Sequence, residues 1–183
     1  MEEFNIDEKG VFHSSWNITY KIYKLNLTEL ITNLLSEIKS ILTQYETVMM
    51  NDGKLIGNEK ISMYRKLETI LQLLVFSRIY INKNYTKNTY SESNIKIFLK
   101  ADTDYYIQGN INFSEIAGLI HLGDWLKQLL LKMITDYTTE VKQVLEDKVI
   151  TVEEGLGLCK TLDKIIMKVL IAYYKMKYEN INK

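Results

Sequence analysis

Apolar residues recur at alternating steps of three and four along four stretches of the chain, which is the spacing of amphipathic helices. Short connecting stretches at residues 51–55 and 146–150 separate the first from the second and the third from the fourth. Thr151 opens a capping-box pattern, Thr-Val-Glu-Glu, at the start of the fourth stretch. The pattern therefore predicts two long helical hairpins, at 28–81 and 124–177, whose apolar stripes close into a bundle.

The two predicted hairpins are equally long. A shift of 95 residues lays residues 28–80 over residues 123–175 without a gap, and apolar positions coincide along this alignment, although few residues are identical. An internal repeat would produce this agreement, and so would the shared period of two amphipathic hairpins. Both interpretations stay open at the level of the sequence.

Three other segments alternate apolar and polar residues, and this period of two is typical of a half-buried strand. The segments are Trp16–Leu25, Ile95–Lys100 and Tyr105–Phe113. Residues 101–104 have turn-forming side chains, so the last two segments form a β-hairpin at 95–113. We therefore expect a small antiparallel sheet of about three strands. The predicted fold class is α+β, mainly α-helical, in a single domain over residues 1–183.

The composition is that of a globular protein without charge bias. The chain has 183 residues, of which 46% are hydrophobic and 25% charged, with 23 Lys plus Arg against 23 Asp plus Glu. Zero net charge gives no long-range attraction for a polyanion, which argues against nucleic-acid binding. It also removes self-repulsion, so we expect a homo-oligomer. Apolar runs are far shorter than the roughly 20 residues that span a membrane. We expect a cytoplasmic protein without membrane association.

The residue types needed for catalysis or metal binding are scarce. His13 and His121 are the two histidines, and Cys159 is the single cysteine. The loop at 52–59 resembles the second half of a calcium-binding EF-hand loop, but apolar residues stand where two oxygen ligands are needed. The aspartates of the 101–104 turn form a pair, Asp102 and Asp104, that fits turn formation as well as metal binding. We expect no catalytic residue, no metal site and no cofactor.

Tyrosines and lysines are interleaved in two segments. The candidate interface residues are Tyr80, Lys83, Tyr85, Lys87 and Tyr90 in the first segment and Tyr173, Tyr174, Lys177 and Tyr178 in the second. Tyrosine is enriched at protein interfaces, and aromatic rings beside ammonium groups also stack on bases and bind phosphates. Composition offers a third explanation, because the chain is rich in Ile, Asn, Lys and Tyr, as expected of an A/T-rich genome.

The motif-poor, proline-free sequence favours a non-catalytic protein-interaction module that binds a protein partner through its surface. A phage or mobile-element accessory protein, such as an inhibitor of a host system, fits this description. The alternative is a nucleic-acid or nucleotide-binding protein that uses the two Tyr/Lys segments, which requires the segments to meet in the fold. An enzyme with a non-standard site is the third hypothesis.

Overall fold

The computed structural model describes residues 3–6, 11–17, 26–51, 54–55, 57–90, 95–101, 104–110, 122–146, 149–178 and 181–182. Side chains are described over 26–47, 57–90, 127–133, 135–141 and 149–173, together with Gln143, Met176 and Lys177. Within these residues the four long helices are α1 (Leu27–Asn51), α2 (Gly57–Tyr85), α4 (Leu122–Glu146) and α5 (Val152–Tyr178).

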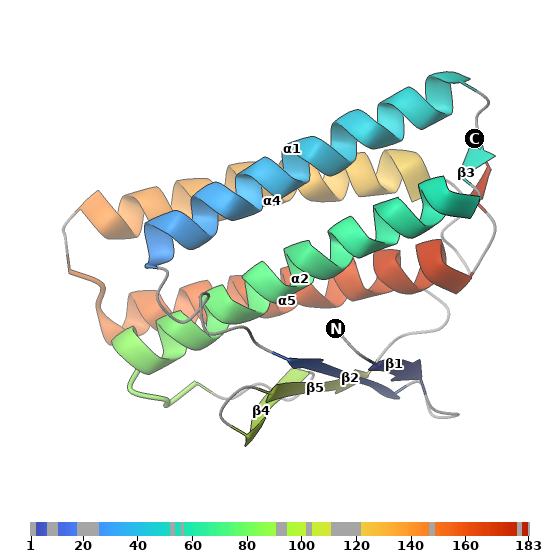
Figure 1. Cartoon of the computed structure of the whole chain (residues 1–183). Coiled ribbons are helices and arrows are strands. Elements are labelled where there is room, and N and C mark those ends of the chain that lie inside the picture. Colours follow the sequence, from blue (N-terminus) through green and yellow to red (C-terminus); the bar gives the residue numbers. More distant parts are fainter. Residues whose placement is uncertain are drawn as a thin grey trace.

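The four helices form a bundle in which neighbouring helices run antiparallel (Figure 1). Helices α2 and α5 lie side by side, α1 packs against α2, and α4 packs against α5. The helical bundle predicted from the sequence is confirmed. Within the described part of the chain, none of the helices combines the length and the apolarity that crossing a membrane requires.

Reciprocal capping fixes where two of the helices begin. At α1 the amide of Glu29 donates to Asn26 Oδ1, and the amide of Asn26 donates to Glu29 Oε2, both at 2.9 Å. At α5 the amide of Glu154 donates to Thr151 Oγ1 at 3.2 Å, and the amide of Thr151 donates to Glu154 Oε2 at 2.9 Å. The cap of α1 is thus Asn26 rather than Thr28, because only Asn26 has a glutamate three residues on.

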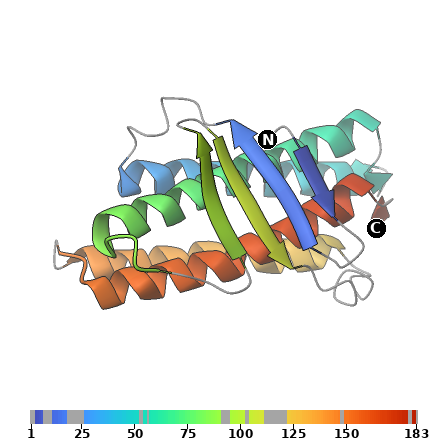
Figure 2. The ribbon, with the colours of Figure 1, turned by 90° about the horizontal axis from the view of Figure 1, so that it is seen from below.

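Residues 70–78 of α2 and 169–173 of α5 are buried nearly all round. Leu73, Leu74, Val75 and Phe76 of α2 are at most 7% exposed, and residues 169–173 of α5 are at most 1% exposed. Figures 1 and 2 show the reason, because α2 and α5 lie between α1 and α4 on one side and a sheet on the other. Their apolar circumference is therefore buried within one chain.

The sheet is antiparallel, with strand order β1-β2-β5-β4. Its strands are β1 (Glu3–Ile6), β2 (Val11–Asn17), β4 (Ile95–Ala101) and β5 (Asp104–Asn110), and two short strands, β3 (Lys54–Leu55) and β6 (Ile181–Asn182), pair separately. Val11 lies opposite Asn110, and Ile95 lies opposite Gly109. The predicted strand Trp16–Leu25 overlaps β2 only at its first two residues, and residues 18–25 lie outside the described residues.

The predicted α+β class is wrong, and the protein is mainly helical. Over the residues whose side chains are described, the chain is 91% helical and contains no strand. The described core consists of helix residues together with Ile150, which precedes α5. A period of two in the sequence indicates a strand but not its share of the core, so the alternating segments do not establish an α+β class.

The two helical hairpins occupy equivalent positions at an offset of 95 residues. Helix α4 begins and ends 95 residues after α1, and α5 begins 95 residues after α2. Polar contacts between α2 and α5 follow the same offset. Arg78 contacts Asp163, Tyr173 contacts Glu68, and an offset of 95 converts the first pair into the second. That the equivalence arose by duplication stays a prediction.

Candidate interaction surface

The chain folds back on the end of α2 in a turn. The amide of Asn88 donates to the carbonyl oxygen of Asn82 at 2.8 Å, and the amide of Thr89 donates to that of Thr86 at 3.1 Å. Lys87 and Asn88 adopt φ angles of 53° and 60°, in the left-handed region that ends many helices. This conformation costs a residue with a side chain about 1–2 kcal/mol, so contacts around the turn must stabilise it.

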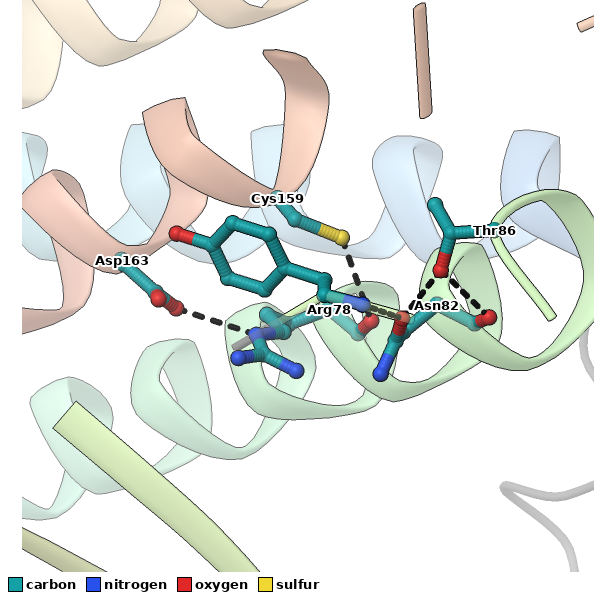
Figure 3. A network of polar contacts seen from close by, with 6 residues as sticks. Arg78, Asn82, Thr86, Cys159 and Asp163 are labelled. Atoms are coloured by element: carbon teal, nitrogen blue, oxygen red, sulfur yellow. Dashed lines mark hydrogen bonds and ion pairs between the residues drawn. The ribbon is translucent and has the colours of Figure 1, made fainter. Parts of the chain in front are cut away.

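Side chains of α2 supply those contacts (Figure 3). Oδ1 of Asn82 accepts a hydrogen bond from the Thr86 hydroxyl group and another, at 3.1 Å, from the amide of Tyr90. The guanidinium carbon of Arg78 lies 4.4 Å from the centroid of the Tyr90 ring, which is a cation–π contact. Residues 86–90 are therefore held in one conformation against the end of α2.

Arg78 also joins α2 to α5 inside the bundle. Its Nε donates to Asp163 Oδ1 at 3.1 Å, and the two side chains are only 7% and 4% exposed. The Cys159 thiol lies 3.9 Å from the carbonyl oxygen of Arg78, and burial raises the pKa of this thiol to about 12 (Figure 3). A thiol that stays protonated at neutral pH is a poor nucleophile.

Gly155 allows α5 to approach the turn closely. A Cβ at this position would lie 2.8 Å from Thr86 Cγ2 and 3.2 Å from Tyr85 Cβ, distances too short for any larger residue without a shift. The segment before α5 therefore reaches the same end of the bundle as the turn (Figure 1). Val149 of this segment and Val152, the first residue of α5, are 67% and 44% exposed.

We call this end of the bundle the α2-end surface and define it by seven residues. They are Tyr80, Lys83, Tyr85, Lys87, Tyr90, Val149 and Val152. The three tyrosines are half-buried, whereas both lysines and both valines are exposed. The rings of Tyr80 and Tyr85 meet edge to face, with their centroids 6.1 Å apart. The pKa of Tyr85 is raised, mainly by burial and to a smaller extent by the neighbouring Tyr80. Fixed aromatic rings with apolar neighbours and a charged rim are typical of protein interfaces.

The second predicted Tyr/Lys segment lies elsewhere. Tyr173 is fully buried, donates its hydroxyl hydrogen to Glu68 Oε1 at 2.6 Å and meets the Tyr64 ring edge to face at 6.0 Å. Lys177 Nζ lies 5.4 Å from the centroid of the Tyr173 ring. The side chains of Tyr174 and Tyr178 lie outside the described residues. Since α2 and α5 are antiparallel, the Tyr80–Tyr90 segment meets the start of α5 and not its end, so the two segments do not come together.

The described residues contain no cluster of three or more His, Cys, Asp or Glu side chains that could hold a metal ion. His121 and Asp102 lie outside the described residues, as do residues 52, 53 and 56 of the connection after α1. The side chains of His13 and Asp104 are also not among those described. Within the described part, the α2-end surface is therefore the best candidate for a functional site.

Sequence reasoning missed Val149 and Val152. The capping box at Thr151 was recognised, and it places Val152 in the first helical turn, where neighbouring turns give little cover. Two valines beside a helix cap were therefore a signal of exposed apolar side chains. Comparisons with protein-family models, curated proteins and solved structures found no match to this chain.

Proposed function

We propose that the protein is a non-catalytic interaction module of the cytoplasm that binds a protein partner through the α2-end surface. The observation that carries the proposal is the turn at residues 86–90. It is held by Asn82 and Arg78, yet Lys87, Asn88 and Thr89 are exposed, and the chain at the nearby start of α5 includes two exposed valines. A surface that is ordered before binding loses little conformational entropy when a partner docks.

The charge at this surface favours a protein over a nucleic acid. Lys83 and Lys87 are its two exposed cations, and Glu153 and Glu154 lie at the adjacent start of α5. If both lysines neutralised phosphates of a single strand, a plot of the logarithm of the binding constant against the logarithm of the salt concentration would have a slope of only about −1.4. That is a weak electrostatic contribution, and the second Tyr/Lys segment lies too far along the bundle to add to it.

Self-association belongs to the same proposal, because zero net charge leaves no repulsion to keep copies apart. The biological setting we propose, an accessory or inhibitor protein of a phage or mobile element, rests on the composition of the chain. A protein partner would bind this chain tightly only if a few rigid side chains are buried at the centre of the interface.

Site-specific photo-crosslinking in the native host tests the proposal. A photoreactive phenylalanine analogue at Lys87 or at Val149 should yield a discrete protein adduct, whereas the same analogue at the exposed Thr69 of α2 should not. Val149→Glu should abolish the adduct formed from position 87. Ile61→Glu is the matched control, since Ile61 is also an exposed apolar residue but lies far from the end of α2. It should leave the adduct intact. Adducts with nucleic acid, or equal protein adducts at Thr69, would contradict the proposal.

A further inference from the structure

Helices α4 and α5 border a groove of about 470 Å³. Its apolar lining comes from Leu129, Met133 and Ile165, each at most 9% exposed. Exposed lysines line it as well, and they are Lys132, Lys164 and Lys168. Small-molecule sites have volumes of about 300–1,000 Å³ and combine a mainly apolar lining with a few polar groups. The groove has the size of such a site, and three of its ten lining residues are apolar.

Among the described side chains, one of the three lysines has a charge partner. Lys132 forms an ion pair with Asp136 at 4.0 Å, and Glu140, which also lines the groove, accepts a hydrogen bond from Thr161 at 2.9 Å. For Lys164 and Lys168 the described side chains provide neither an ion pair nor a hydrogen bond. These two residues are four positions apart on α5 and so lie on the same face of the helix. The groove therefore combines an apolar floor with three lysines and two carboxylates, a net charge of +1, and Lys164 and Lys168 are the two lysines without an ion pair among the described side chains.

The equivalent positions in the first hairpin are partly polar and partly apolar: Lys164 corresponds to the exposed Thr69, and Lys132 corresponds to Glu37. At the offset of 95 residues, Lys168 corresponds to Leu73 and Asp136 corresponds to Ile41, which are 7% and 0% exposed. The bundle therefore accepts buried apolar side chains at two positions where the α4–α5 groove has charged ones. Charges at positions that packing would fill with apolar residues are expected where binding, rather than stability, determines the residue.

We propose that the α4–α5 groove binds a small organic anion with an apolar body. Lys164 and Lys168 hold the acidic group, which is a carboxylate, a sulfonate or a phosphate, and the body lies on Leu129, Met133 and Ile165. The ligand is bound without a covalent step. This site is separate from the α2-end surface, so each of the two proposals can fail without the other.

The test is a fluorescence titration of the full chain with anilinonaphthalene sulfonate and with its uncharged analogue N-phenylnaphthylamine. The anionic dye should bind one site per chain at least tenfold more tightly than the neutral dye. Decanoate should displace it, because decanoate has both an acidic group and an apolar body, whereas inorganic phosphate at the same concentration should not. Equal affinity for the two dyes, or no binding of the anionic dye, would overturn the proposal.

Variants of α5 locate the site. The change of both Lys164→Gln and Lys168→Gln should weaken binding of the anionic dye at least tenfold, while Lys160→Gln should change it less than twofold. Lys160 is the matched control, because it is an exposed lysine of the same helix that does not line the groove. Lys168→Leu, which introduces the residue of the first hairpin, should abolish binding without lowering the midpoint of thermal unfolding. Unchanged dye affinity in the double variant would refute the assignment.

Discussion

Replacing Gly155 with alanine tests the close approach of α5 to the turn that builds the α2-end surface. The new Cβ would meet Thr86 Cγ2 at 2.8 Å and Tyr85 Cβ at 3.2 Å, so either α5 or the turn must move. Such overpacking costs about 1–3 kcal/mol, whereas alanine in place of glycine in a helix gains about 0.5–1 kcal/mol. We expect a net loss of about 1–2 kcal/mol in the free energy of unfolding.

Gly157→Ala is the matched control. The added Cβ would have Glu140 Oε1 as its nearest neighbour at 3.8 Å, an ordinary contact, so only the gain in helix propensity remains. Urea unfolding followed by circular dichroism at 222 nm should therefore show opposite signs for the two variants at an unchanged m-value. If Gly155→Ala proved as stable as Gly157→Ala, the close contact would not exist in solution.

The same variant should loosen the turn. Because Thr86 is displaced by the new Cβ, the hydrogen bonds that Asn82 accepts from Thr86 and Tyr90 should weaken. Hydrogen exchange of the Tyr90 and Asn88 amides should then become faster in Gly155→Ala and remain unchanged in Gly157→Ala. Unchanged exchange in both variants would show that α5 does not position the turn.

Four further outcomes are expected. Asp163→Ala should lower the free energy of unfolding in urea by about 3–5 kcal/mol, because it leaves Arg78 charged and buried. The double change Arg78→Met with Asp163→Leu should lower it clearly less. A larger loss in the double variant would contradict this expectation. Burial raises the pKa of Cys159 from 9.0 to about 12. The contribution of the protonated thiol to folding stability is therefore complete below pH 9 and is lost as the pH rises toward 12. Cys159→Ala should remove this part of the loss of stability at alkaline pH. Sedimentation at tens of micromolar should show a species heavier than 21.5 kDa, and a purely monomeric protein would refute self-association. A random single-stranded oligonucleotide should not bind about 1 µM protein at about 150 mM salt, and saturation in fluorescence anisotropy would promote the nucleic-acid alternative.

The helices were predictable because their apolar period extends over many turns. The predicted starts at Thr28 and Asp124 lie within two residues of Leu27 and Leu122, and the capping box at Thr151 is formed as predicted. The N-terminal strand begins at Val11 rather than at the predicted Trp16, because alternation alone does not determine which residues pair. The register of β2 follows its partner β5, and a single segment carries no information on that partner.

The candidate site was predictable only in part. Tyrosine and lysine at residues 80–90 are visible in the sequence, but the order and direction of helices in a bundle are not. That order brings Gly155 to the turn and leaves Tyr173 in the core. The contact of Arg78 with Asp163 joins residues 85 positions apart, and such a long-range polar pair leaves no periodic signal.

The two polar contacts between α2 and α5 are one reason to propose the interface at the α2 end of the bundle. Arg78 with Asp163 and Tyr173 with Glu68 occupy equivalent positions at the 95-residue offset. Arg78 additionally holds the Tyr90 ring, so this buried contact positions a residue of the α2-end surface.

At the other contact, the Tyr173 ring lies against Tyr64 and Lys177, which both belong to the helices of the bundle. Tyr173→Phe, which removes the hydrogen bond to Glu68, should therefore lower stability without changing hydrogen exchange in the turn. Arg78→Met, which removes the contact with the Tyr90 ring, should accelerate hydrogen exchange in the turn. If both variants left the turn unchanged, the link from the core to the surface would be broken, and with it the reason to place the interface at this end.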